Sequence, residues 1–135
     1  MNLYIFPAAA SMSNGYGIGV NFAYNKLRPK DDDIVVWYTK LPREKMMYVR
    51  NTDVILKKNN FLSFRSVSNI LGGKDRTELH YCDLSFLAKY NFDEIHLDES
   101  FFYRPMRKMF PDKKMTIRFH NCYSRIHDRQ LLLQN

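Results

Sequence analysis

The segment Ile34–Tyr38 constrains the fold most strongly, because it is an unbroken run of β-branched and aromatic residues. A strand with one solvated face alternates apolar and polar side chains, whereas an unbroken run is typical of a strand covered on both faces. Such strands occur mainly in parallel sheets, whose connections are usually helices. The segment therefore predicts an α/β domain.

The first 27 residues have the pattern of a strand, a loop and a helix, in that order. Residues 2–6 favour a strand, and the loop after them ends in Gly15, Gly17 and Gly19. Residues 20–27 carry apolar side chains at helical spacing. Glycine lets backbone N–H groups approach a ligand closely, and the positive end of a helix dipole favours an anion. We therefore expect either an anion-binding loop here or, more simply, a tight strand-to-helix turn.

Strand and helix patterns alternate along the rest of the chain. Four segments are expected to be parallel strands of one sheet: residues 2–6, 34–38, 94–97 and 115–119. Residues 46–49 and 53–56 are weaker strand candidates, and a helix is expected to begin near Arg104 with Pro105 in its first turn. This alternation predicts a Rossmann-like three-layer α/β sandwich with a mostly parallel sheet, formed as one domain by residues 1–135.

Ligands of such sheets bind beyond the carboxyl ends of the strands, where the strand order reverses. The candidate residues that follow the expected strands are the segment Ser11 to Gly17, with Gly15 and Gly17 in it, and then Thr39, Lys40, Asp98, Glu99, His120 and Asn121. A dinucleotide site is not predicted, because Val20 stands where the third glycine of that fingerprint belongs. Thr39 and Lys40 also stand where an acidic partner of the ribose belongs.

The net charge of +7 predicts a polyanionic neighbour, which could be a phosphate ligand, a nucleic acid or an anionic lipid surface. Cys82 and Cys122 lack the spacing of a metal or redox site, so we expect reduced thiols and no metal. The N-terminus lacks the basic and long apolar regions of a secretory signal, and no apolar run reaches membrane-span length. These features favour a cytoplasmic protein.

Three parts of the chain resemble one enzyme family. They are the glycine-rich loop after the first strand, residues 93–100 (Asp-Glu-Ile-His-Leu-Asp-Glu-Ser) and residues 110–121 (Phe-Pro-Asp-Lys-Lys-Met-Thr-Ile-Arg-Phe-His-Asn). Together they resemble the N-terminal domain of GT-B glycosyltransferases, and most closely the retaining enzymes that extend bacterial surface polysaccharides. Two positions differ from the family pattern, which has paired glycines at Asn14-Gly15 and no arginine at Arg118.

The resemblance implies an enzyme that moves a sugar from a nucleotide-sugar donor to a glycan or lipid-linked acceptor. In that family this domain mostly receives the acceptor, while a second Rossmann-like domain holds the nucleotide sugar and supplies two carboxylates. Residues 1–135 contain no such second domain. We therefore expect a fragment that is inactive alone, needs a C-terminal domain as its partner, uses no cofactor, and lies in the cytoplasm or at the inner face of the membrane.

The resemblance also implies roles for single residues. Gly15 and Gly17 would line the donor diphosphate, and His120 would be the catalytic-site residue that approaches the transferred sugar. Three residues would contact the acceptor: Asp98, Glu99 and Asn121. Each has a structural alternative, such as a tight turn for Gly17, or an N-cap for Asn121. His96, between two apolar strand residues, is expected to be a hydrogen-bonded core side chain.

The basic charge also admits a module that binds nucleic acid or another protein without catalysis. Aromatic and basic residues interleave at residues 61–65 and 101–108, which suits base stacking and phosphate contact. No motif of a known nucleic-acid-binding module is present, so we rank this function second and expect no nucleic-acid partner. If the charge meets an anionic membrane instead, six cations should cluster on one side: Lys40, Arg43, Lys45, Arg104, Arg107 and Lys108.

Overall fold

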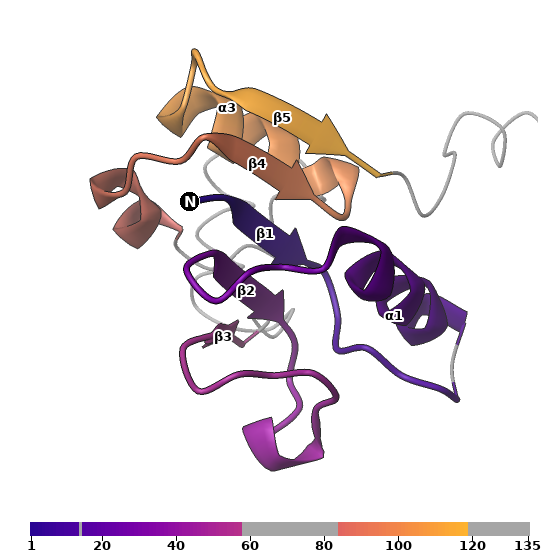
Figure 1. Cartoon of the computed structure of the whole chain (residues 1–135). Coiled ribbons are helices and arrows are strands. Elements are labelled where there is room, and N and C mark those ends of the chain that lie inside the picture. The colour runs from indigo at the N-terminus through magenta and orange to yellow at the C-terminus, as the bar shows by residue number, and fades with distance from the viewer. Residues whose placement is uncertain (14, 58–83, 119–135) are drawn as a thin grey trace, which may run out of the picture.

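The computed structural model describes residues 1–13, 15–57 and 84–118, and within them five strands form one parallel sheet (Figure 1). The strands lie in the order β3-β2-β1-β4-β5. Their bounds are Leu3–Phe6 (β1), Ile34–Tyr38 (β2), Val54–Leu56 (β3), Glu94–Leu97 (β4) and Lys114–Ile117 (β5). The predicted α/β class with a parallel, Rossmann-like sheet is confirmed.

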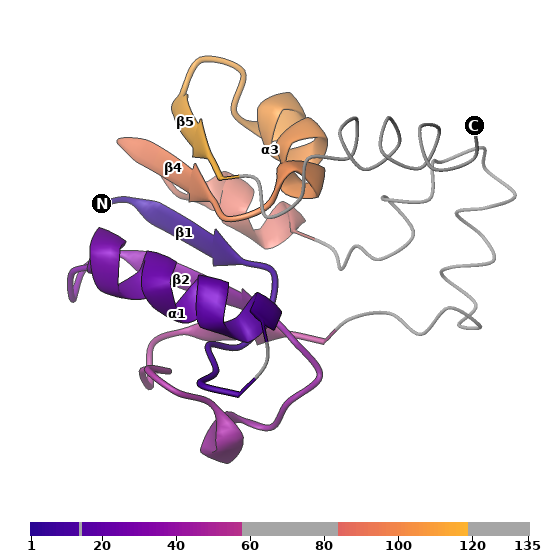
Figure 2. The ribbon, with the colours of Figure 1, turned by 90° about the vertical axis from the view of Figure 1, so that its right-hand side faces the viewer.

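Helices lie on both faces of the sheet. Helix α1 covers one face, and α3 lies on the opposite one (Figure 2). The described helices are α1 (Gly15–Leu27), α3 (Tyr103–Met109) and the short 3-10 segments η1 (Arg43–Lys45), η3 (Ser85–Lys89) and η4 (Ser100–Phe102). Pro105 sits in the first turn of α3, as predicted, where its missing N–H has no helical acceptor to lose.

The central strand β1 contributes side chains to two hydrophobic cores. Leu3 and Ile5 point toward α3, whereas Tyr4 and Phe6 point toward α1. The core on the α3 side is formed by Leu3, Ile5, Val36, Tyr38, Leu84, Leu87, Phe92, Ile95, Leu97, Phe102, Met106 and Phe110. The core on the α1 side is formed by Tyr4, Phe6, Ala10, Val20, Ala23, Val35 and Trp37. Strand β2 contributes side chains to both cores, so the prediction of a strand covered on both faces is correct.

The α1 face is covered only in part. Five strands about 4.8 Å apart span roughly 19 Å, and a helix is only about 10 Å wide. Helix α1 lies over β1 and β2, and beside it a groove of about 330 Å³ runs between α1 and the ends of β4 and β5. Strand β4 alternates here, with Ile95 and Leu97 buried toward α3, and Glu94 and His96 turned to the α1 side.

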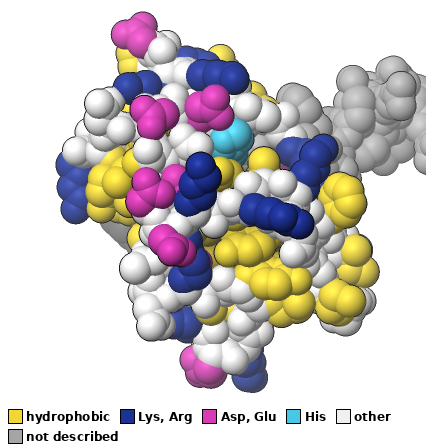
Figure 3. Space-filling model, in the orientation of Figure 1, with side chains coloured by type: hydrophobic (Ala, Val, Ile, Leu, Met, Phe, Trp, Pro, Cys, Tyr) yellow, Lys and Arg dark blue, Asp and Glu magenta, His cyan; other side chains and the backbone are white. Residues whose placement is uncertain are grey.

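The α1 face also presents exposed apolar side chains. Phe22 is 67% exposed and Ile18 is 47% exposed, on successive turns of α1. In Figure 3, which views this face, hydrophobic side chains gather on one side, and charged side chains of both signs are interspersed over the remainder. This face therefore carries no field of a single sign.

Two predicted boundaries are wrong. Helix α1 begins at Gly15, so the three glycines lie in its first turns and not in the loop. Residues 46–49 form no strand, because Tyr48 adopts a left-handed backbone (φ 63°) and the segment packs as a loop against the α1-side core. The predicted elements within residues 58–83 and 119–135 lie outside the described residues.

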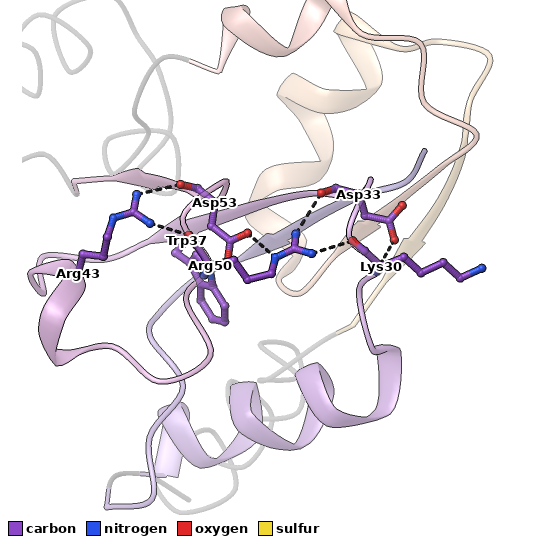
Figure 4. A network of polar contacts seen from close by, with 6 residues as sticks. All are labelled: Lys30, Asp33, Trp37, Arg43, Arg50 and Asp53. Carbon is purple, nitrogen blue, oxygen red and sulfur yellow. Dashed lines mark hydrogen bonds and ion pairs between the residues drawn. The ribbon is translucent and has the colours of Figure 1, made fainter.

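The carboxylate of Asp53 organises the loops at the amino end of the sheet (Figure 4). It is fully buried, and accepts hydrogen bonds from the Trp37 indole N–H (3.0 Å) and from the backbone N–H (2.9 Å) and Nε (2.8 Å) of Arg50. The Arg50 guanidinium then donates to the backbone oxygens of Lys30 (2.7 Å) and Asp33 (3.0 Å). One charge pair thus joins two loops to the Trp37 side of the core.

Arg43 and Asp33 extend the same network. Arg43 donates to the backbone oxygens of Arg50 (2.7 Å) and Asp53 (2.9 Å). Asp33 accepts from the backbone N–H groups of Asn2 (2.8 Å) and Lys30 (2.9 Å). The network therefore also fixes the entries into β1 and β2.

We predict that Asp53→Ala lowers the free energy of unfolding by about 3–5 kcal/mol, because it leaves the Arg50 guanidinium and the Trp37 N–H without their buried acceptor. Urea unfolding followed by tryptophan fluorescence measures the change. The exposed Asp31→Ala serves as the control and should stay within about 0.5 kcal/mol of wild type. Equal stability of the two variants would contradict the role given to Asp53.

Candidate functional site

The candidate site lies at the carboxyl end of the sheet, between β1 and β4. After β1 the chain passes to α1 on one face, whereas after β4 it passes to η4 and α3 on the other face (Figure 1). Neighbouring parallel strands whose connections leave toward opposite faces open a crevice at their carboxyl ends. The β1–α1 loop and the β4–η4 junction are therefore the two walls of the site.

The first turn of α1 forms one wall. Gly15 is exposed, and a Cβ atom added to it would meet nothing within 4 Å. Gly17 is buried, and its backbone oxygen accepts a hydrogen bond from the Ser11 backbone N–H (3.0 Å). The chain's own packing thus leaves open space at Gly15, whereas Gly17 holds the preceding loop. The first turn itself carries no acidic side chain, and the positive end of a helix dipole favours an anion.

Glu99 forms the other wall and connects it to α1. Its side chain is fully buried, and Oε2 accepts a hydrogen bond from the Tyr16 hydroxyl (2.8 Å). Oε1 accepts from the Ser100 backbone N–H (2.9 Å) and hydroxyl (3.2 Å). Tyr16 lies within the predicted segment Ser11 to Gly17, but no role was predicted for its side chain. Its position between Gly15 and Gly17 was the only signal in the sequence that could have drawn attention to it.

Asp98 holds the same edge through Arg118. The buried Asp98 carboxylate accepts hydrogen bonds from Nε and from Nη2 (2.9 Å) of Arg118. Arg118 Nη2 also donates to the backbone oxygen of Gly19 (2.8 Å). The arginine that departs from the family pattern therefore links the ends of β4 and β5 to α1.

The structure brings four of the predicted site residues together: Gly15, Gly17, Asp98 and Glu99. Both carboxylates are buried and engaged by neighbours of the same chain, so their visible role is to fix the edge. Thr39 is buried after β2, where its hydroxyl accepts from the Leu41 backbone N–H (3.2 Å). His120 and Asn121 lie outside the described residues.

His96 lies on the floor of the groove beside α1. Its ring stacks on Tyr4 (centroids 4.8 Å apart), its Nε2 lies 3.3 Å from a Glu94 oxygen, and its buried Nδ1 has no hydrogen-bond partner in the described part of the chain. Burial lowers the pKa of His96 from its usual 6.5, Glu94 opposes this shift, and Lys114 adds to it. His96 is thus a half-buried residue of the groove and not the expected hydrogen-bonded core side chain, and among the described residues only its Nε2 has a polar neighbour.

The six cations considered for a membrane surface do not gather. Arg43 bonds the backbone at Arg50 and Asp53, and Arg107 bonds the backbone oxygens at the end of α3. Segment η1 and helix α3 lie at opposite ends of the molecule in both ribbon views (Figures 1 and 2). The described ranges also contain no group of three His, Cys, Asp or Glu residues placed to hold a metal ion. None of their helices has the length and apolar character needed to cross a membrane.

Comparisons with known proteins add no relative to this picture. No protein-family model, curated protein or solved structure matches the chain. The function is therefore inferred from the geometry of the carboxyl edge and from the sequence motifs.

We predict that Tyr16→Phe destabilises the protein by about 1.5–3 kcal/mol, because the buried Glu99 carboxylate loses its only hydrogen bond from α1 that the structure describes. Chemical denaturation provides the measurement. Tyr103→Phe removes the hydroxyl of a tyrosine that is 39% exposed, and is expected to change stability by less than about 0.5 kcal/mol. If both variants behave alike, Tyr16 does not hold the edge.

We further predict that His96 makes stability depend on pH. The pKa of His96 is lower in the folded chain than in the unfolded chain, so the unfolded chain binds the proton more readily. The free energy of unfolding should therefore be unaffected by His96 above about pH 6.5 and should fall as the pH drops below that value. Unfolding experiments between neutral and mildly acidic pH should show a flatter profile for His96→Gln than for wild type. Identical profiles would show that His96 titrates normally.

Proposed function

We propose that the chain is the acceptor-side domain of a glycosyltransferase, which moves a sugar from a nucleotide sugar to a glycan or lipid-linked acceptor. The observation that supports this proposal most is the carboxyl edge between β1 and β4. There the open first turn of α1 faces a wall whose acidic side chains are buried and already hydrogen-bonded within the chain.

The chemistry of this edge suits a diphosphate. An anion placed at the start of α1 would meet the positive end of the dipole of a helix of 13 residues. A free carboxylate beside it would repel the anion, but the Arg118 guanidinium and the Tyr16 hydroxyl engage Asp98 and Glu99. The preference for an anion therefore depends on the positive end of the α1 dipole.

The structure changes the roles that we assign to the acidic residues. The geometry makes Asp98 and Glu99 positioning residues, which set the distance between α1 and β4. Gly15 keeps its role as the point of close approach to the donor. His120 and Asn121 are proposed, from the family resemblance alone, to orient the transferred sugar and to contact the acceptor.

In this proposal residues 1–135 do not catalyse transfer alone, because a second domain is needed to bind the nucleotide and to enclose the reacting groups. The test compares residues 1–135 with the complete product of the same reading frame, each supplied with nucleotide sugars and lipid-linked glycans. Transfer of labelled sugar is expected only from a product that includes a second domain. Absence of transfer, together with tight binding of residues 1–135 to single-stranded nucleic acid, would overturn the proposal.

Gly15→Ala provides a sharper prediction for the active product. Stability should be unchanged or raised by up to about 1 kcal/mol, because the new methyl group meets nothing and alanine favours a helix. The KM for the nucleotide sugar should rise by roughly 10-fold, because the methyl group occupies the space next to the diphosphate. Lys30→Ala, at the opposite end of the sheet, is the control and should leave KM unchanged. An unaltered KM in Gly15→Ala would remove Gly15 from the donor site.

A further inference from the structure

A cluster of four aromatic rings reaches from the α1-side core to the surface, and three of them, Phe6, Trp37 and Tyr24, are mutual neighbours, with Phe6 and Tyr24 tilted (centroids 5.7 Å apart). Phe6 stacks on Trp37 (centroids 4.8 Å apart), Trp37 stacks on Tyr24 (5.5 Å), and Tyr24 stacks on Tyr48 (4.9 Å). The rings of Tyr24 and Tyr48 are nearly parallel, with 4° between their planes. Tyr48 is thus the outermost ring of the cluster, and Phe6 and Trp37 are its buried rings in the core.

The backbone at Tyr48 is in the left-handed region, with φ of 63°. Glycine or asparagine adopts this conformation easily, whereas a bulky residue there is uncommon and strained. A loop that needed only the turn would be better served by one of those residues. The presence of tyrosine therefore calls for a contribution from its side chain.

Hydrogen bonds fix the Tyr48 ring in one orientation. Its hydroxyl donates to Asn21 Oδ1 (2.7 Å), and accepts from Asn25 Nδ2 (3.3 Å). Asn25 Nδ2 also donates to Asn21 Oδ1 (2.8 Å) and to the Asn21 backbone oxygen (2.9 Å). Both amides project from α1, so the helix and the aromatic cluster together position the phenol.

The Tyr48 ring is nevertheless 38% exposed. One of its faces is covered by the parallel ring of Tyr24, so the exposed area belongs to its outer face and its edge. Asn25 Oδ1, next to the phenol, accepts no hydrogen bond from the residues that the structure describes. The result is a flat, pre-oriented aromatic surface with a free amide oxygen at its side.

We propose that Tyr48, Asn21 and Asn25 form a carbohydrate-binding platform that takes one pyranose ring. The weakly positive C–H groups on one face of a pyranose match the negative face of an aromatic ring, and an adjacent sugar hydroxyl can donate to the Asn25 oxygen. The side chains that bond the phenol are neutral amides, which suits an uncharged sugar. The platform lies on the second half of α1, away from Gly15, so it is separate from the carboxyl edge and independent of the function proposed for that edge.

The experiment titrates tetrasaccharides built from glucose, galactose, mannose or N-acetylglucosamine into the labelled full chain, and follows backbone and side-chain amide resonances. Contact with a single ring gives weak affinity, so concentrations up to about 10 mM are needed. At least one tetrasaccharide should shift the Asn21 and Asn25 side-chain amides. Tyr48→Asn, which removes the ring but tolerates the left-handed backbone, should weaken that binding by at least about 10-fold.

Two further variants separate the ring from general effects. Tyr48→Phe keeps the stacking surface, and should bind within about threefold of wild type. Tyr103→Asn removes a tyrosine of similar exposure from α3, and should leave binding unchanged. Amide spectra establish that each variant is folded. The proposal is overturned if no tetrasaccharide shifts the two amides, if folded Tyr48→Asn binds as well as wild type, or if only mononucleotides bind there, which would indicate base stacking.

Discussion

The two hydrophobic cores of this domain depend on one strand that is buried from both sides. Every side chain of β1 is buried, and successive residues point to opposite faces. Because β1 lies at the centre of the sheet, each core is built against the same backbone, and neither can shift without the other. The carboxyl end of β1 is therefore held by both cores, which suits a site that must hold reacting groups in fixed positions.

The strands could be predicted well because their signal is local. The apolar runs gave β1, β2 and β4 almost to the residue. The start of α1 could not be predicted, because glycine has low helix propensity and its place in the first turns is decided by contacts with the preceding loop. Residues 46–49 resemble a strand, but their apolar side chains are used to cover the flank of α1. Tertiary packing overrode the local pattern in both places.

The rule for parallel sheets predicted which residues lie at the carboxyl edge, but it did not predict their partners within the chain. Asp98 and Glu99 stand at the edge where the sequence placed them, yet nothing local indicates that Arg118 and Tyr16 would engage them. These pairs join residues far apart in the chain, so only the fold reveals that both carboxylates already have partners. The same limit applies to Tyr48, because the aromatic cluster that it joins is assembled from four separate segments of the chain.

Arg118 gives the edge strand β5 an unusual dependence on the rest of the fold. An edge strand has one neighbour, and its end is ordinarily free to fray without disturbing distant elements. Here the residue just after β5 is bonded to Asp98 beyond β4 and to Gly19 in α1. Fraying of β5 would therefore remove one of the contacts that hold α1, so that local opening at the sheet margin is coupled to the order of the candidate site.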